Sequence, residues 1–309
     1  MRETPFDVLG LGIVTVDDLL YVAAYPPPEA KVRVRHRTRQ CGGLTGTALV
    51  AAARLGSRCA YAGVLGTDEL SQFVRETFRR EGIDLESVSP LADVAPIHST
   101  IVVDQTAGTR TIFFERADDL GDSPSWPPEE RIRSARVLFV DHQHAEAMVR
   151  AATIARAAGI PVVADFERAE APRFPELLAL ADHLILSRDF AARLTGRADP
   201  AAAAEALWAE GRAAVVVTCG AGGCHYLGGT TAGGTRHQPA FAVPVVDTTG
   251  CGDVFHGAYA AALAWGADLA DRVRFASAAA GLKAMTFGGQ AGIPARAAVE
   301  ALIGGTTPG

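Results

Sequence analysis

Two glycines and an acid precede an alanine-rich run in the segment DTTGCGDVFHGAY, residues 247–259. Gly250 and Gly252 flank Cys251, and Asp253 follows directly. A helix that begins here presents unpaired backbone N–H groups at the positive end of its dipole, and such groups bind anions. The glycines allow the backbone to approach an anion closely and to adopt positive φ. The segment therefore predicts a phosphate cradle.

Asp253 is unusual in such a cradle, because its carboxylate would repel the bound anion. A carboxylate is useful there if it accepts a proton from an attacking hydroxyl, as an aspartate does in kinase catalysis. The alternative is a glycine-rich turn with Asp253 as a helix cap. Other phosphate motifs are absent from the sequence: no Gly-x-x-x-x-Gly-Lys-Ser/Thr segment occurs, and GLGIVT (10–15) lacks the third glycine of a dinucleotide fingerprint.

Strands and helices alternate along most of the chain, which predicts an α/β fold. Apolar, β-branched runs predict strands at 6–16, 59–66, 136–141, 161–166, 183–187 and 213–220. Helical patterns occupy 42–56, 69–82, 145–158, 175–181, 188–195, 200–210, 252–265 and 268–284. This alternation produces a mostly parallel sheet with helices on both faces, and ligands bind beyond the carboxyl ends of its strands.

Two β segments interrupt the alternation. KVRVRHRTR (31–39) alternates strictly and predicts a half-exposed strand, and residues 99–115 predict a hairpin around a TAG turn. Both lie between strand–helix units. We expect them to form a small sheet that covers the site as a lid.

Composition excludes several classes of protein. The 309 residues carry a net charge of −6 and are 49% apolar, so we expect no nucleic-acid partner and no membrane partner. The five cysteines include no Cys-x-x-Cys pair, which argues against a zinc site or a disulfide framework. No signal peptide or membrane-length apolar run is apparent, so the expected location is the cytoplasm.

Three separated segments resemble the signatures of one family, the PfkB/ribokinase carbohydrate kinases. DTTGCGD (247–253) resembles its C-terminal signature, CGGLTGTALVAAARLG (41–56) its N-terminal signature, and VTCGAGG (217–223) its nucleotide-side turn. In motif detail the chain looks most like the sulfofructose kinase branch. The resemblance implies a ribokinase-like three-layer sandwich in one domain, residues 1–309, with lid segments at about 14–40 and 97–116. It also implies Mg²⁺-ATP as donor and a sugar hydroxyl as acceptor.

The resemblance also assigns roles to individual residues. Asp253 is the implied general base, and the anion hole is formed by Gly250, Cys251 and Gly252. The implied sugar-binding residues are Asp17, Gly42, Gly43 and Thr47, the last standing where many members have Asn. The implied nucleotide-binding residues are Thr218, Gly220, Gly223 and Thr248. Asp247 and Thr249 match positions that hold a monovalent cation, such as K⁺, in some members.

The chain departs from the family pattern at several positions. SRDF (187–190) has Phe190 where the family often has the Glu of Asn-x-x-Glu, which serves the Mg²⁺ side. We therefore take Asp165 as a candidate substitute for the metal. Lys31 matches a sulfonate-binding lysine of the sulfofructose kinases, but Phe114 and Gln143 stand at that branch's other sulfonate contacts.

Five cations fall on alternate positions of the predicted lid strand: Lys31, Arg33, Arg35, Arg37 and Arg39. A period of two places them on one strand face. That face is either solvated or an interface with acidic partners, and we expect a homodimer through the lid. We expect Lys31 or Arg33, by contrast, to reach an acidic group on the substrate.

Three smaller features complete the candidate site. His142 and His144 follow a predicted strand and are substrate-side candidates. Asp17 and Asp18 are adjacent, so at most one faces the site, and the resemblance selects Asp17. Cys251 would be a moderately reactive thiol if the helix dipole favoured its thiolate, or a small packing residue if it faced the helix interior.

The leading interpretation is an ATP-dependent kinase that phosphorylates a hydroxyl of a sugar or acidic sugar derivative. A nucleoside kinase is an alternative, because that branch shares the cradle. A sensor that binds sugar or nucleotide without turnover is a second alternative, suggested by Phe190. Asp253 argues against the sensor, since a pure binding protein needs no base.

Overall fold

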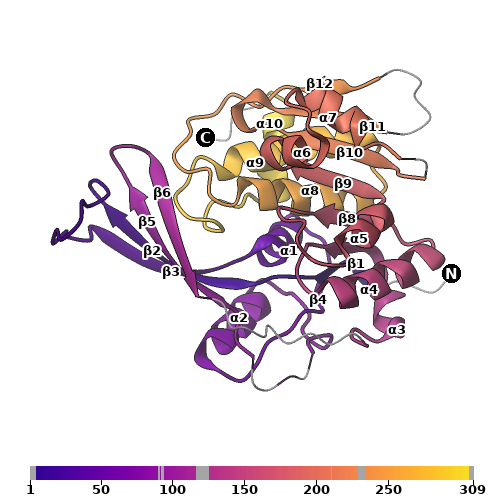
Figure 1. Cartoon of the computed structure of the whole chain (residues 1–309), viewed down its shortest axis with the longest axis horizontal. Coiled ribbons are helices and arrows are strands. Elements are labelled where there is room, and N and C mark those ends of the chain that lie inside the picture. The colour runs from indigo at the N-terminus through magenta and orange to yellow at the C-terminus, as the bar shows by residue number, and fades with distance from the viewer. Residues whose placement is uncertain are drawn as a thin grey trace.

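Two sheets of different size organise the molecule (Figure 1). The structure is a computed structural model that describes residues 5–89, 91, 94–115, 125–209, 211–228 and 234–305. The large sheet contains, in spatial order, β12 (Arg236–Gln238), β11 (Cys224–Gly228), β10 (Ala214–Thr218), β9 (His183–Ser187), β8 (Val162–Asp165), β7 (Ala135–Val140), β1 (Phe6–Leu11) and β4 (Cys59–Tyr61). Its strands pair in parallel from β10 to β4, whereas β11 and β12 are antiparallel additions at one edge.

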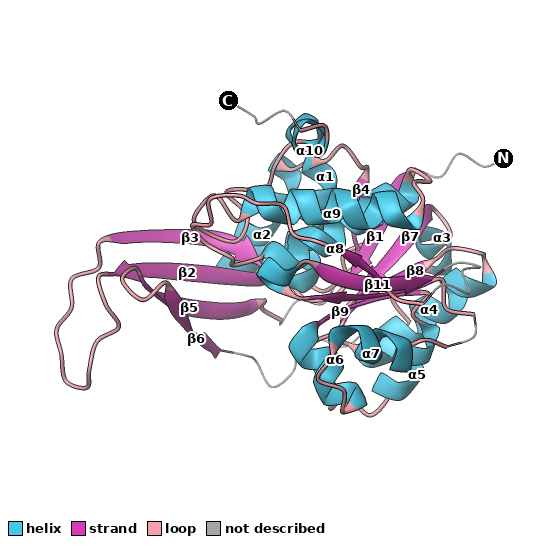
Figure 2. Cartoon of the chain, turned by 90° about the horizontal axis from the view of Figure 1, so that it is seen from above, coloured by secondary structure: helices cyan, strands magenta, loops and turns pink. Residues whose placement is uncertain are grey.

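Helices cover both faces of the large sheet, which confirms the expected α/β architecture (Figure 2). One face carries α1 (Leu44–Arg54), α8 (Cys251–Ala264) and α9 (Leu269–Lys283), whose small side chains enter one hydrophobic core. The other face carries α4 (Ala145–Ala157), α5 (Phe174–Leu180), α6 (Arg188–Thr195) and α7 (Pro200–Ala206) over a second core. The remaining helices are α2 (Glu69–Arg80), α3 (Glu129–Ile132) and α10 (Arg296–Ile303).

Close packing of α1 against α8 depends on a glycine. A Cβ at Gly257 would lie 2.1 Å from the main-chain oxygen of Ala48, so only glycine allows this approach. The alanines that follow on α8 are fully buried. The alanine-rich sequence after the cradle therefore brings α8, with Asp253 in its first turn, against the middle of the sheet.

The predicted strand 6–16 is wrong, because the chain changes sheets within it. β1 ends at Leu11, and β2 (Thr15–Val22) begins in the small sheet. Asp141, at the end of β7, holds the break: its Oδ2 accepts hydrogen bonds from Ile13 N (2.6 Å) and Thr45 Oγ1 (2.8 Å). A Cβ at Gly12 would lie 2.1 Å from the same oxygen, so the turn requires glycine there.

The small sheet has the order β3-β2-β5-β6, and it projects from one side of the body (Figure 1). Its other strands are β3 (His36–Gly42), β5 (Ile97–Asp104) and β6 (Thr109–Glu115). The predicted hairpin is confirmed as β5–β6, while position 116 of the expected lid segment lies outside the described residues. These are the segments that the sequence assigns to the lid.

The predicted strand 31–39 is misplaced. Pairing with β2 begins only at His36, and Lys31, Arg33 and Arg35 lie in an exposed loop before it. The five cations therefore do not share one strand face. Arg37 and Arg39 lie within β3 and form ion pairs with Asp18.

Four short elements have no counterpart in the sequence-based prediction, namely α3, β11, β12 and α10. β12 has only three residues and adds to the antiparallel edge. Within the part of the chain that the structure describes, no helix has the length and apolarity needed to cross a membrane.

Candidate active site

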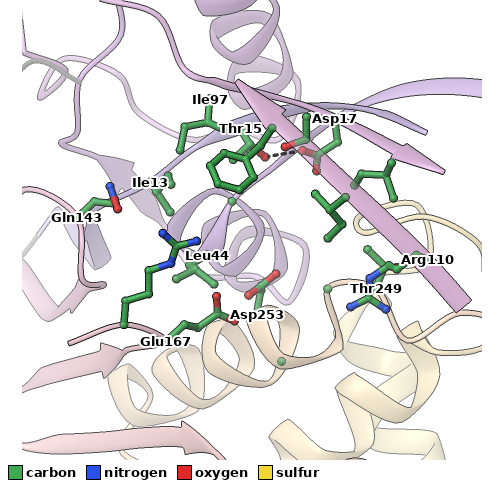
Figure 3. Close-up of a pocket in the computed structure, with 18 of the residues that line it drawn as sticks. Ile13, Thr15, Asp17, Leu44, Ile97, Arg110, Gln143, Glu167, Thr249 and Asp253 are labelled. Carbon is green, nitrogen blue, oxygen red and sulfur yellow. Dashed lines mark hydrogen bonds between the residues drawn. The ribbon is translucent and has the colours of Figure 1, made fainter. Parts of the chain in front are cut away.

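A cavity of about 370 Å³ lies between the small sheet and the carboxyl ends of the large sheet (Figure 3). The small sheet contributes residues such as Thr15, Asp17 and Ser99, and the body contributes Thr248–Gly250, Gly252 and Asp253. Gly43, at the N-terminus of α1, also lines the cavity. The structure therefore brings the implied sugar-side acid and the implied base to one space.

The cradle forms where α8 begins. Its N-cap is Gly250, with φ 77°, and a Cβ there would lie 2.8 Å from the main-chain oxygen of Gly289. The N–H of Cys251 already donates to Thr248 O at 3.2 Å, so it is not a free donor as the sequence led us to expect. Among the described residues, the N–H groups of Gly252 and Asp253 have no main-chain acceptor, so they remain the open donors at this helix end. A Cβ on Gly252 would meet nothing within 4 Å, so the backbone there is open to a ligand.

Asp253 lies at the cavity among other acids. Burial raises the pKa of Asp253 well above its ordinary value, and the carboxylates of Asp165, Glu167 and Asp17 add to the rise. Figure 3 shows Glu167 and Asp253 with their carboxylates in the same part of the cavity. A carboxylate held at a raised pKa is a better proton acceptor once it ionises.

Asp17 lies on the cavity face of β2 and Asp18 on the opposite face, as expected. Asp17 Oδ1 accepts a hydrogen bond from Thr15 Oγ1 at 2.8 Å, and burial raises the pKa of Asp17. Asp18 binds Arg39 and His98, and the hydrogen bond from Arg39 is the main cause of its lowered pKa. Asp17 is thus the acid available to a ligand.

Glycine makes room for Asp17. A Cβ at Gly42 would lie 2.1 Å from Asp17 Oδ2, so Gly42 acts by permitting this side chain. Gly43 has φ 85° and turns the chain into α1. Thr47, the implied sugar contact, is buried on α1 outside the cavity, and its Oγ1 accepts a hydrogen bond from Gln290 at 3.4 Å, so this geometry does not support a sugar contact.

Strand register places a row of cavity residues across the small sheet. Asp17 is opposite Ser99, and Ser99 is opposite Phe114. The guanidinium of Arg168, from the loop after β8, lies over the Phe114 ring at 5.9 Å from its centroid. A ligand in this row would have Asp17 at one end and Arg168 at the other.

Arg110 is a second cation of the cavity. It lies on β6, four residues before Phe114, and Figure 3 shows it beside Thr249 of the cradle. Among the described residues, neither Arg110 nor Arg168 forms an ion pair with a carboxylate. Both charges are therefore available to an anionic ligand.

The expected substrate contacts of Lys31 and Arg33 are not supported by this geometry. Neither residue lines the cavity, because the loop that carries them precedes β3 and is exposed. His142 and Gln143 do line it, whereas His144 lies outside it at the N-terminus of α4.

Asp165 is not placed to contact a metal in the cavity. It is buried at the end of β8, outside the lining, and its Oδ2 lies 3.3 Å from His256 Nδ1. Burial raises the pKa of Asp165 well above its ordinary value. Glu167, two residues later, lines the cavity and is exposed. Phe190 packs against Phe174 in the core and offers no oxygen.

The expected nucleotide-side turn lies at the carboxyl end of β10, the edge of the large sheet that also borders the cavity. Thr218 ends β10, Gly220 begins a short 3-10 turn with φ 56°, and Gly223 follows with φ 81°. A Cβ on Gly223 would lie 2.1 Å from the main-chain oxygen of Gln238, which gives this glycine a packing role. These three residues lie outside the cavity, whereas Thr248 lines it.

The surroundings of Cys251 disfavour the reactive thiolate that one interpretation expected. Burial raises the pKa of its thiol, and Asp247 and Asp253 oppose the thiolate further, while Lys283 favours it. The packing interpretation of Cys251 therefore fits the structure better.

Asp247 is tied into the loop that precedes the cradle. Its carboxylate accepts hydrogen bonds from Thr249 N and Gly288 N, both at 2.8 Å. Its main-chain oxygen accepts one from Lys283 Nζ at 2.9 Å. Among the described residues, no group of three or more His, Cys, Asp or Glu side chains could hold a metal ion.

Sequence reasoning missed four cavity or near-cavity residues: Glu167, Arg168, Arg110 and Lys283. A signal existed for Glu167 and Arg168, because they follow the carboxyl end of a predicted strand, where ligands bind. Arg110 depends on hairpin register, and Lys283 resembles an ordinary basic residue in the last turn of a helix. Neither of these two could be identified from sequence alone.

Comparison with known proteins gives a consistent result. A family model described as "pfkB family carbohydrate kinase" matches residues 7–296. The chain is 27% identical to a ribokinase of Haemophilus influenzae, covering 96% of this chain and 97% of that one. It is 25% identical to a 5-dehydro-2-deoxygluconokinase of Shouchella clausii, covering 96% and 95%. The crystal structure of a putative ribokinase from Agrobacterium tumefaciens superposes with a TM-score of 0.90 at 30% identity, covering 97% and 98%.

Proposed function

Since the chain belongs to the pfkB family of carbohydrate kinases, we propose that Asp253 is its general base and that its acceptor is an anionic sugar derivative. A member of this family is a phosphotransferase that moves a phosphoryl group from ATP to an alcohol. The observation that carries the proposal is the shared cavity, in which Asp17 and Asp253 meet one space from different sheets. The acceptor's hydroxyls bind Asp17, and one of them reaches Asp253.

Asp253 accepts the proton of the attacking hydroxyl, and the helix N-terminus stabilises the charge on the transferred group. The open N–H groups at Gly252 and Asp253 support this role, because preorganised donors stabilise charge as it develops. Arg110, beside Thr249, supplies a further positive charge at the same end of the cavity. Thr218 and Gly220 remain candidates for the adenosine side, outside the cavity.

Glu167, rather than Asp165, is the residue we propose on the Mg²⁺ side. Oxygen donors suit Mg²⁺, and Glu167 presents a carboxylate in the cavity next to Asp253. Bound Mg²⁺ neutralises charge on the transferred phosphoryl group. Potassium, which the resemblance implies at Asp247 and Thr249, is considered below.

An anionic acceptor is supported by Arg168. This cation lies at the Phe114 end of the row that begins at Asp17, so a sugar bound by Asp17 would place its far end near Arg168. One relative is named for a sugar acid, 5-dehydro-2-deoxygluconate, and another for ribose. No relative reported above is named for sulfofructose, and Lys31 lies outside the cavity, so we do not propose that substrate. A sugar acid is the preferred class.

ADP release with a panel of acceptors tests the proposal. The panel contains ribose, fructose, adenosine, sulfofructose and a series of sugar acids. We expect the highest kcat/KM with a sugar acid, and we expect Arg168→Gln to raise its KM by about 10- to 100-fold, the value of one charged hydrogen bond. Arg33→Gln is the matched control and should change KM little. Highest activity on adenosine would favour the nucleoside kinase, and binding without turnover on any acceptor would favour the sensor.

A homodimer through the lid also remains a proposal. β6 is exposed along its whole length, and Phe113, on the face away from the cavity, is 53% exposed. Exposed aromatic residues on an edge strand favour association. Sedimentation analysis of Phe113→Lys against the unchanged chain would test this: a monomeric variant supports the lid interface, and an unchanged mass opposes it.

A further inference from the structure

Lys283 is a fully buried cation next to the phosphate cradle. It is the last residue of α9 and has no exposed surface, although lysines are rarely buried without a partner. Its ammonium donates to the main-chain oxygen of Asp247 at 2.9 Å. Among the described residues it forms no ion pair with a carboxylate. The chain therefore maintains a desolvated positive charge at this place, which is costly unless an anion compensates it.

The surroundings connect Lys283 to the cradle. Burial lowers the pKa of Lys283, and the nearby charges of Cys251, Asp247 and Asp253 raise it. Val246 N and Asp247 N both donate to the main-chain oxygen of Ala284, the residue after Lys283. The loop that leads into the cradle is thus fixed to the end of α9, with the ammonium at the junction.

The same place is where the resemblance implies a monovalent cation. A cation there would use the oxygens of Asp247, each of which already accepts one hydrogen bond, and the donor to its main-chain oxygen is the positively charged Lys283 Nζ, 2.9 Å away. A second positive charge would also be repelled by the ammonium. The residues present therefore do not fit a bound K⁺.

We propose that Lys283 is a built-in substitute for the monovalent cation, and that it holds the 247–250 loop and supplies positive charge beneath the bound phosphates. Lys283 is a positioning residue, since it acts through Asp247 and the loop. The consequence is that the protein needs no potassium. The activity readout rests on the proposed kinase function, whereas the stability and ATP-binding readouts do not.

The experiment compares chlorides of tetramethylammonium, sodium and potassium at constant ionic strength. For the unchanged protein we expect the same melting temperature, ATP-analogue affinity and kcat/KM in all three salts, within about twofold. Lys283→Ala removes the charge and vacates its space. We expect its ATP-analogue affinity and kcat/KM to fall at least tenfold in tetramethylammonium and to recover partly in potassium, with a rise in melting temperature that sodium and tetramethylammonium do not produce.

Two further variants control for size and charge. Lys283→Met fills the space without charge, so potassium should not rescue it. Arg274→Met removes an exposed cation from the same helix and should show no salt-specific response. Potassium activation of the unchanged protein, or Lys283→Ala that binds ATP normally in tetramethylammonium, would overturn the proposal. If Lys283→Ala does not fold, the test rests on the unchanged protein, whose activity, ATP-analogue affinity and melting temperature should be the same with and without potassium. Loss of turnover on every acceptor would refute the kinase proposal but leave the binding and melting results decisive.

Discussion

Gly252 is a position where the fold does not require glycine but the proposed phosphate site does. It lies in the first turn of α8 without positive φ, and an added Cβ would meet no protein atom within 4 Å. Gly252→Ala should therefore fold with equal or slightly higher stability, because alanine favours helix by up to about 1 kcal/mol. Its methyl group would occupy the place where, under the proposed function, phosphate approaches the N–H groups. We expect a KM for ATP raised at least tenfold, measured by initial rates.

Gly257→Ala, on the same helix, is the matched control and should have the opposite effect. Its Cβ would lie 2.1 Å from Ala48 O, so the melting temperature should fall because α1 and α8 must separate. If Gly252→Ala bound ATP normally, the phosphate would lie elsewhere than at this helix end.

As the proposed general base, Asp253 should set the acid side of the pH profile. In that role its ionised form accepts the proton, and burial with neighbouring acids raises its pKa, so kcat/KM should rise with pH through that pKa. Glu167→Gln removes one of the neighbouring negative charges and should move this rise to lower pH.

Asp253→Asn should lower kcat by about 10² to 10⁴ and leave ATP binding intact.

The pH profile of Glu167→Gln separates two roles for that residue. A shifted profile with a weaker Mg²⁺ dependence supports a place beside both Asp253 and the metal. Asp165→Asn serves as the comparison, and an equal or larger change in its Mg²⁺ midpoint would return the metal role to Asp165.

At the level of strands and helices, Asp141 fixes the point where β1 leaves the large sheet. The fully buried carboxylate accepts hydrogen bonds from Ile13 N, Thr45 Oγ1 and Gln143 N. Asp141→Ala leaves these donors without a partner, and we expect a loss of about 2 to 4 kcal/mol in the free energy of unfolding. Urea denaturation measures this change. A loss below about 1 kcal/mol would mean that water or a neighbour replaces the carboxylate.

Most regular elements could be predicted from the sequence, but not the places where long-range contacts determine where an element begins or ends. The buried parallel strands and the alanine-rich helices have unmistakable local patterns, and they were placed within a few residues. The break within 6–16 was hidden because both halves are apolar and β-branched, and Asp141, which fixes it, is distant in sequence. The alternation at 31–39 imitates a strand, but pairing with β2 starts only at His36.

The candidate site divides in the same way. Asp253, the cradle and Asp17 could be predicted, because local sequence and the resemblance carry them. Arg110 and Arg168 reach the cavity through hairpin register and loop conformation, which local pattern does not encode. The sugar-side role of Thr47 came from the resemblance alone, and local sequence does not show that its hydroxyl accepts a hydrogen bond from Gln290.

At the scale of the whole fold, a buried histidine should make stability depend on pH. His183, at the start of β9, packs against α8, where its Nδ1 and the hydroxyl of Tyr259 are 2.9 Å apart. Burial lowers its pKa to about 3. The unfolded chain therefore binds a proton that the folded one does not between about pH 6.5 and 3, and this group's contribution to stability is lost as pH falls through that range.

His183→Asn keeps a polar partner for Tyr259 and removes the titration. We expect a flatter dependence of unfolding free energy on pH between about 3 and 6.5 than in the unchanged chain. Asp141, whose pKa burial raises to about 6, acts in the opposite direction, because the folded chain keeps its proton while pH rises from about 4. Equal slopes for His183→Asn and the unchanged chain would exclude His183 as the cause.

Under the proposed function, the division of the cavity between two sheets should also govern the fate of ATP when no sugar is present. Water can attack a phosphoryl group as a sugar hydroxyl does, but it contacts only one wall of the cavity. In the proposed binding mode, a sugar held by Asp17 on the small sheet reaches Asp253 on the body, so only the sugar would gain the rate advantage of being held across both. Hydrolysis of ATP by water should therefore be slow, although no separate element of the fold prevents it. The selectivity for sugar over water would then depend on β2, the strand with which the chain crosses from the large sheet to the small one.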